Sequence, residues 1–319
     1  MKYQVAQFSV AGGRSANEDR VGIAERPNAV LMVVADGLGG HSGGELAAQT
    51  VVETVLKVFQ GVKEPRLADP FAFLALTILK AHRAIHTRAQ MHVPPLEART
   101  TCVVCLVQDG YAYWAHVGDS RLYHFRRARL LKRTEDHTPV EELRRDGVIS
   151  EEEMASHPRK SFLLRSLGGG EDPRIALGEE TALHPDDTLL LCSDGLWESL
   201  PAAAIVSHLE APRLEDGIED MLFAAEKRMG DGADNITVAC LRWEDRATLM
   251  PSLRPTSLSQ IDSEHLYRQA AVKKLAGNRS ASAPTTPKTS TPTPPASRKS
   301  IDRDIEELEN YLKQFEPKN

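Results

Sequence analysis

The stretch that decides the fold class is TCVVCLVQDGYAYWAHVGDSRLYHF, residues 101–125. It contains three short runs rich in apolar and β-branched residues, at 101–107, 111–117 and 121–125, and such runs are typical of strands. Asp109-Gly110 joins the first two runs, and a turn at Gly118 joins the second and third. Connections this short link antiparallel neighbours, because a parallel crossover needs a dozen or more residues. We therefore expect an antiparallel meander of three strands.

The rest of the first 245 residues alternates irregularly between strand and helix patterns. Further strands are expected at 29–35, 188–192 and 236–241. Apolar residues at three- and four-residue spacing predict helices at 45–59, 70–90, 139–145, 151–156, 202–209 and 214–229. The predicted class is α+β with antiparallel sheets.

Charge and composition divide the 319 residues into three parts. Residues 246–319 carry 12 of the 39 Lys and Arg residues and 8 of the 45 Asp and Glu residues. This tail thus has a surplus of four positive charges, and the preceding part has a surplus of ten negative charges. An acidic body is not suited to nucleic acid, which binds basic surfaces, but it is suited to cations. We expect a catalytic domain at 1–245, a linker at 246–300 and a helix at 301–316.

The two tail segments differ in pattern. Ser, Thr and Pro make up 15 of the 22 residues from Arg279 to Ser300, a composition that cannot bury enough apolar surface to fold. Beyond it, Ile301, Ile305, Leu308, Leu312 and Phe315 recur at helical spacing between acidic residues. This pattern predicts an amphipathic helix that binds a protein partner or the catalytic body.

The compartment predicted from the sequence is the cytoplasm. No apolar run approaches the roughly 20 residues of a membrane-spanning helix, and the first ten residues lack a secretory pattern. Four cysteines in a chain of this length do not form a disulfide framework. We expect no contact with membrane or nucleic acid, and a monomer.

Four aspartates stand at the ends of predicted strands. Asp36 closes the run at 29–35, Asp119 follows 111–117, Asp194 follows 188–192, and Asp234 precedes 236–241. Asp-Gly pairs commonly end strands as ordinary turns, which explains any one of them. Several carboxylates brought to one sheet edge cannot all stay ionised without a cation between them. All-oxygen ligands favour magnesium or manganese over zinc.

Seven short motifs occur along the first part of the chain. They are Arg14-Ser-Ala-Asn-Glu-Asp19, Ala35-Asp-Gly-Leu-Gly-Gly-His41, Thr100-Thr101, Val117-Gly-Asp-Ser-Arg121, Asp136-His137, Leu191-Cys-Ser-Asp-Gly195 and Asp234-Asn-Ile-Thr237. Their order and spacing resemble those of the bacterial metal-dependent protein serine/threonine phosphatases of the type 2C (PPM) family. The resemblance covers about residues 1–243. It implies a four-layer α/β/β/α sandwich, with two antiparallel sheets flanked by helices.

The resemblance also implies a role for each acidic position, with two to three Mn²⁺ or Mg²⁺ ions as cofactors. Asp36 would bridge two ions, with the Gly37 carbonyl on one of them. Asp194 and Asp234 would complete the other ion, Glu18 and Asp19 would lie beside the second ion, and Asp119 with Asp194 would form a third site. Arg14 would hold the substrate phosphate. A segment at about 138–167, locally basic through residues such as Arg144 and Lys160, would form a flap beside the metals; the alternative is a plain solvated face.

One position departs from the family pattern. Eukaryotic relatives place a histidine, proposed as the general acid, directly after the Asp-Gly pair, and here that residue is Leu38. His41 lies three residues further on. It is a candidate proton donor or a structural residue of the loop, and water can serve the same purpose.

Two pairs of potential metal ligands have simpler explanations. Cys102 and Cys105 lie three apart on a predicted strand, so they face opposite sides and are expected to be core residues. His82 and His86 are one helical turn apart, but Arg83 stands where a zinc protease motif has glutamate. We expect both histidines at the surface.

The resemblance thus implies hydrolysis of phosphoserine and phosphothreonine monoesters on proteins. The enzyme would oppose a Ser/Thr kinase, and that kinase would be one of its substrate proteins. One alternative is a pseudo-phosphatase or regulatory binding module, which the complete set of acidic positions disfavours. The other is a metal-dependent phosphodiesterase or nuclease, which the acidic body disfavours.

Overall fold

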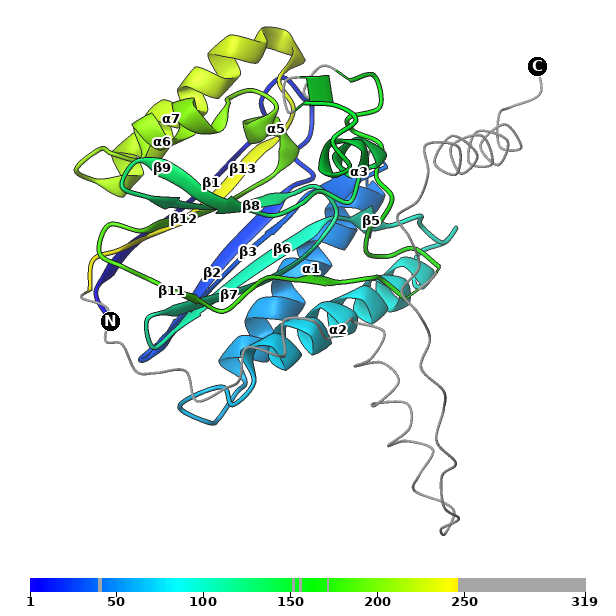
Figure 1. The fold of residues 1–319 in the computed structure, drawn as a ribbon. Helices are drawn as coiled ribbons and strands as arrows, with labels where there is room; N and C mark the ends of the chain where they lie inside the picture. Colours follow the sequence, from blue (N-terminus) through cyan, green and yellow to red (C-terminus); the bar gives the residue numbers. More distant parts are fainter. Residues whose placement is uncertain (40–41, 151–152, 155–156, 171, 246–319) are drawn as a thin grey trace, which may run out of the picture. The chain divides into compact units, whose positions relative to one another are not determined.

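The computed structural model describes residues 1–245 except 40–41, 151–152, 155–156 and 171. Two antiparallel sheets and two groups of helices form four layers (Figure 1). The expected fold class is confirmed. The predicted linker at 246–300 and the predicted helix at 301–316 lie outside the described residues.

The first sheet has five strands. In spatial order they are β1 (Tyr3–Val10), β13 (Ile236–Trp243), β12 (Thr188–Cys192), β8 (Arg121–Arg126) and β9 (Arg129–Arg133). β1 and β13 pair over eight residues, from Tyr3 opposite Trp243 to Val10 opposite Ile236. The strand nearest the start of the chain is therefore paired with the last strand described.

The second sheet has six strands. Its order is β10 (Ala176–Leu177), β7 (Tyr111–Val117), β6 (Cys102–Gln108), β3 (Ala29–Ala35) and β2 (Arg20–Arg26), and β11 (Thr181–Ala182) also pairs with β7. A separate short ladder joins β4 (Gly37–Leu38) to β5 (Arg99–Thr100).

Helices cover the outer faces of both sheets. Their bounds are α1 (Ser42–Gln60), α2 (Pro70–Gln90), α3 (Pro139–Arg145), α5 (Asp194–Trp197), α6 (Ala202–His208), α7 (Leu214–Met229) and a 3₁₀ turn at Gly230–Gly232. α1 and α2 lie on the second sheet, and α6 and α7 lie on the first (Figure 1). None of the helices in the described ranges is both long and apolar enough to cross a membrane.

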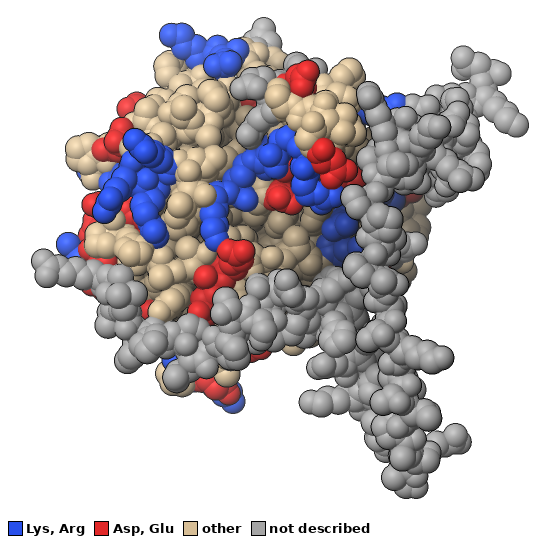
Figure 2. All heavy atoms as spheres, viewed as in Figure 1, with Lys and Arg blue, Asp and Glu red and all other residues tan. Residues whose placement is uncertain are grey.

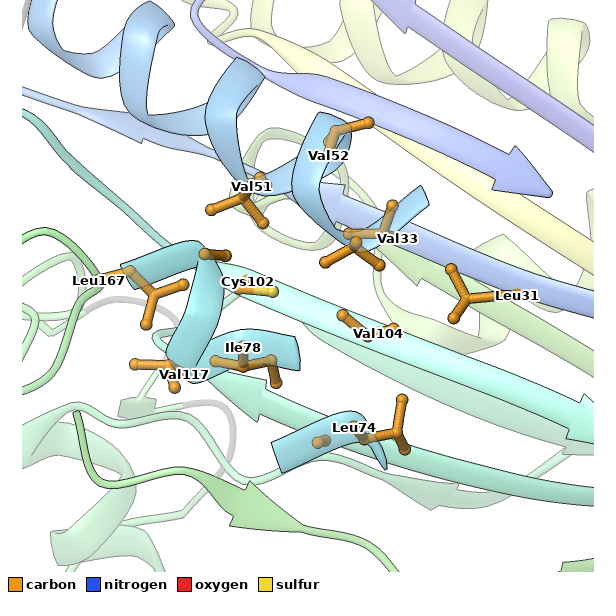
Figure 3. Packing of buried hydrophobic residues seen from close by; sticks show 14 of the residues in the cluster. Leu31, Val33, Val51, Val52, Leu74, Ile78, Cys102, Val104, Val117 and Leu167 are labelled. Atoms are coloured by element: carbon orange, nitrogen blue, oxygen red, sulfur yellow. The ribbon is translucent and has the colours of Figure 1, made fainter. Parts of the chain in front are cut away.

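Strand β3 is apolar throughout because both of its faces are covered. All seven of its residues are buried. Leu31 and Val33 belong to the buried cluster formed with residues of α1 and α2, and Figure 3 shows Val33 beside Val52. The alternate residues, such as Met32, point into the core between the two sheets. A strand covered on both faces cannot alternate apolar and polar residues.

The predicted meander at 101–125 is wrong in its third strand. β6 and β7 pair as expected, but β8 pairs with β12 and β9 in the other sheet. Gly118 has φ +106°, a backbone conformation that favours glycine. This turn carries the chain from one sheet to the other, so Asp119 lies at the crossover.

The two cysteines predicted to be core residues are confirmed as such. Cys102 is buried beneath the helices, and Cys105 is buried between the sheets. The prediction of surface histidines is wrong for His82, which is 3% exposed. Its Nδ1 accepts a hydrogen bond from the Gly168 backbone N–H at 3.1 Å, so it ties the end of the 138–167 segment to α2.

Candidate metal centre

Five aspartates from both sheets gather at one end of the sandwich. Asp19 immediately precedes β2 and Asp36 immediately follows β3, whereas Asp194 begins α5 two residues after β12 and Asp234 precedes β13. Asp119 lies between β7 and β8. The sequence placed four of them at strand ends, and the topology brings these strand ends together.

The cluster is held by direct contact and by burial. The carboxyl groups of Asp36 and Asp194 lie close together, so the charge of one disfavours ionisation of the other. Asp19 and Asp119 are 2% and 3% exposed. Asp19 lies beside Ser193 and Thr237, and its Oδ2 is buried without a hydrogen-bond partner.

Burial and mutual repulsion raise the pKa values of these acids. Burial raises the pKa of Asp19 to about 7, and the charge of Asp194 adds to the effect. Burial, then Glu198 and Asp234, raise the pKa of Asp194 to about 7. The pKa of Asp36 is also raised, by burial first and then by Asp194. The free energy stored in this repulsion is released when a cation binds among the carboxylates.

The donor set fits hard divalent ions. Carboxylate oxygens are the preferred ligands of Mg²⁺ and Mn²⁺, and Asp19 Oδ2 is a buried acceptor that an ion or its water would satisfy. Among the described side chains, no three His, Cys, Asp or Glu residues already converge as a complete metal site. Ions bound here would therefore need water or main-chain oxygens among their ligands.

Two threonines fix the main chain of Asp36. The Thr101 hydroxyl accepts from the Asp36 N–H at 3.0 Å, and the Thr100 hydroxyl donates to the Asp36 carbonyl at 2.7 Å. Thr101 also bonds the Ser120 hydroxyl at 2.7 Å. These bonds link the ends of β3, β6 and the crossover turn, so the carboxylate is held rigidly.

Asn235 holds the loop that carries Arg14 and Glu18. Its Oδ1 accepts from the Glu18 N–H at 2.9 Å, and its Nδ2 donates to the carbonyls of Ala11 and Ala16 at 2.9 and 3.0 Å. Sequence reasoning quoted Asn235 as part of a motif but assigned it no role. A short polar side chain between an acid and a β-branched run was the available signal.

Arg14 lies at the rim of the cluster. Its Nη2 donates to Asp234 Oδ2 at 2.8 Å, and its side chain is 62% exposed. Glu18 is partly buried on the same loop. A Cβ added to Gly44 would come within 2.1 Å of Glu18 Oε2, so the glycine lets this carboxylate approach α1. His41, the predicted proton donor, lies outside the described residues.

The basic segment at 138–167 contacts this end of the sandwich. Lys160 Nζ lies 2.8 Å from Glu198 Oε2, directly after α5. A cavity of about 550 Å³ beside the segment is lined by residues including His116, Asp136 and His137, but by none of the five aspartates. On the face drawn in Figure 2, Lys and Arg side chains lie in separate groups with acidic side chains beside them. That face offers no continuous basic groove for a nucleic acid.

Sequence comparison and structure comparison both match this chain to bacterial protein phosphatases. A family model described as protein phosphatase 2C matches residues 11–227. The serine/threonine phosphatase stp of Listeria monocytogenes is 34% identical over 240 residues, which span 73% of this chain and 93% of that protein. The serine/threonine protein phosphatase PstP of Mycobacterium tuberculosis is 34% identical over 227 residues, 70% of this chain and 42% of that protein.

Two solved structures carry the same fold. The serine/threonine phosphatase of S. agalactiae matches 76% of this chain and all of its own chain, with 30% identity and a TM-score of 0.69. The catalytic domain of PstP in complex with two manganese ions matches 76% of this chain and 99% of its own, with 31% identity and a TM-score of 0.65. On the length of these matches and the order of its motifs, the chain belongs to the protein phosphatase 2C family of serine/threonine phosphatases.

Proposed function

We propose that this chain hydrolyses phosphoserine and phosphothreonine monoesters on proteins at the five-aspartate cluster, with two to three bound Mn²⁺ or Mg²⁺ ions, and that it opposes a Ser/Thr kinase. The observation that supports this most directly is the gathering of five aspartates at one end of the sandwich, where burial and mutual repulsion raise the pKa values of Asp19, Asp36 and Asp194. Carboxylates in such a cluster repel one another unless a cation lies between them, and their oxygens suit a hard divalent ion.

Each acidic residue has a proposed place around the ions. Asp36 would bridge two ions with the Gly37 carbonyl on one, and Asp194 and Asp234 would complete the other. Glu18 and Asp19 would act on the second ion largely through water, and Asp119 with Asp194 would hold a third. When bound, the ions would supply Lewis-acid chemistry, which lowers the pKa of water and offsets charge on the phosphoryl oxygens.

Protein side chains would bind and orient the substrate and hold the Asp36 carboxylate in place. The Arg14 guanidinium, exposed beside Asp234, would bind two phosphoryl oxygens and orient the monoester. The threonine bonds on Asp36 keep its carboxylate from moving as charge develops. The segment at 138–167, tied to α5 by Lys160 and Glu198, would guide a phosphoprotein over the site.

The test is Mn²⁺-dependent release of phosphate from a phosphothreonine peptide, measured beside a phosphodiester of matched leaving group. We expect release from the peptide only, abolished by chelation and by Asp36→Asn. Tight Mn²⁺ binding without release would identify a pseudo-phosphatase, and preference for the diester would identify a phosphodiesterase.

His41 is the candidate for proton donation to the leaving oxygen. If it donates, His41→Ala should slow an alkyl phosphate more than an aryl phosphate, because only the poor leaving group needs the proton. Equal losses on the two esters would reject this role for His41.

A further inference from the structure

The first residue of the Gly118-Asp119 turn is held by His137, the residue just before the predicted flap. The His137 backbone N–H donates to the Gly118 carbonyl at 2.9 Å. The Gly118 N–H donates in return to His137 Nδ1 at 3.1 Å. Both main-chain groups of Gly118 are thus bonded to one residue, which fixes the crossover between the two sheets.

The second residue of the turn is held from the opposite direction. Trp197 Nε1 donates to the Asp119 carbonyl at 3.0 Å. Trp197 is the last residue of α5, and Asp194 is the first. One short helix therefore supplies a carboxylate to the cluster and fixes the main chain that carries another.

The indole of Trp197 is itself held in place by a buried ion pair. The Arg121 guanidinium lies 3.7 Å from the centre of the Trp197 ring, within the range of a cation–π contact. It donates to both oxygens of Asp136, from Nε at 2.9 Å and from Nη2 at 2.6 Å. Both side chains are at most 5% exposed. A two-bond arginine–carboxylate contact fixes the guanidinium plane and hence the ring that packs on it.

We propose that Trp197 is a positioning residue for Asp119, and that Arg121, Asp136 and His137 complete a clamp on the Gly118-Asp119 turn. Asp136 and His137 are consecutive, so the chain entering the flap fixes both residues of the turn. This inference rests on the proposed function, which gives Asp119 a metal ligand's role. Loss of the clamp should affect the ion at Asp119 and leave the ions at Asp36 in place.

Trp197→Phe removes the indole N–H and keeps an aromatic ring beneath Arg121. We expect calorimetric titration with Mn²⁺ to show one ion bound about tenfold more weakly, with the tighter ions within about twofold of wild type. The turnover number should fall at low Mn²⁺ and recover at high Mn²⁺, with KM for the phosphopeptide unchanged.

Trp243→Phe is the matched control, because it makes the same chemical change far from the turn in sequence. Trp243 is 2% exposed and its Nε1 is buried without a hydrogen-bond partner. This variant should bind Mn²⁺ as the wild type does, even if its melting temperature changes.

A second pair of variants tests the other half of the clamp. His137→Asn retains an acceptor for the Gly118 N–H, whereas His137→Leu removes it. We expect the leucine variant to weaken the same ion about tenfold and the asparagine variant to restore it to within about threefold of wild type.

The outcomes separate the clamp from the proposed function. Wild-type Mn²⁺ binding by a folded Trp197→Phe protein would overturn the clamp, while phosphate release by the wild type would leave the function standing. If Trp197→Phe does not fold, equal Mn²⁺ binding by the two His137 variants would overturn it instead. A wild-type protein that neither binds Mn²⁺ nor releases phosphate would refute the proposed function itself.

Discussion

Strand β12 has an aspartate near each end, and the two differ in their counter-charge. Asp187, directly before the strand, is fully buried, but Arg126 donates to both of its oxygens at 2.7 Å and His124 lies 3.0 Å away. Its pKa is lowered to about 2, because these bonds outweigh the effect of burial. Asp194, two residues after the strand, faces other acids and its pKa is raised to about 7. Arg126 provides the counter-charge of Asp187. At Asp194 the neighbouring groups are acids, so a counter-charge there would have to come from a bound metal ion.

The largest expected effect comes from removing charge at the acidic end. Asp36→Asn, Asp194→Asn and Asp234→Asn should each lower phosphopeptide turnover at least about 100-fold at saturating Mn²⁺, because an amide keeps the shape but not the charge that holds the ion. The control is Asp220→Asn, at an exposed position of α7. Two of the three variants keeping more than about a tenth of wild-type turnover would contradict the metal assignment.

Removing charge at the other end should affect stability and not chemistry. Asp187→Asn leaves Arg126 without its partner, so we expect a loss of about 3 kcal/mol in the free energy of unfolding. For a domain of this size that lowers the melting temperature by roughly 6 to 12 °C. Below the transition, turnover should match wild type, and a catalytic defect at 20 °C would show that the two ends are coupled.

The pH dependence of stability should have opposite signs at the two ends. Unfolded aspartate has a pKa of about 3.9. Asp187 therefore stabilises the fold above about pH 4, and this stabilisation is lost as pH falls through 2. Asp19 and Asp194 hold protons more tightly in the folded protein, so the metal-free protein should lose stability as pH rises from 4 to 7.

Thermal melts in chelator and in 1 mM Mn²⁺ check this difference. The chelated protein should melt several degrees higher at pH 5 than at pH 8, and Mn²⁺ should remove or reverse that trend. A chelated melting temperature that rises between pH 5 and 8 would mean that the acidic cluster is already neutralised.

Arg14→Ala should have a smaller effect, concentrated in KM. A phosphate contact that is made in both ground and transition states contributes uniform binding, so we expect KM for the phosphopeptide to rise about tenfold and the turnover number to change less. An unchanged KM would assign Arg14 to the structure of the loop.

The smallest effect is expected from the tail. A protein truncated after residue 245 should hydrolyse small phosphate esters within about twofold of full length, while a different set of proteins copurifies with it. A large loss of small-ester turnover would mean that the tail supports the active site.

Sequence patterns predicted the helices better than the strands. The bounds of α2, α3 and α7 are as expected, and two of these begin at a capping residue followed by proline, Asp69-Pro70 and Thr138-Pro139. β1, β2 and β9 were missed. Each mixes polar or charged residues into its run, because one face or edge meets solvent.

The acidic residues of the site could be identified from the sequence, but the residues that hold them in position could not. An apolar run that ends in Asp-Gly identifies Asp36 and Asp194 locally. The supports act across long separations: Asn235 bonds Glu18 across 217 residues, and Trp197 bonds Asp119 across 78. No local pattern encodes which distant carbonyl a side chain will reach.

The pairing of β1 with β13 has a consequence for the order in which the protein is made. β13 lies between β1 and β12, so the first sheet stays divided until residue 243 has left the ribosome. Four strands of the second sheet and both of its helices are complete by residue 117. Synthesis should therefore produce a half-domain with an uncovered apolar face, which relies on chaperones until the final strand joins β1.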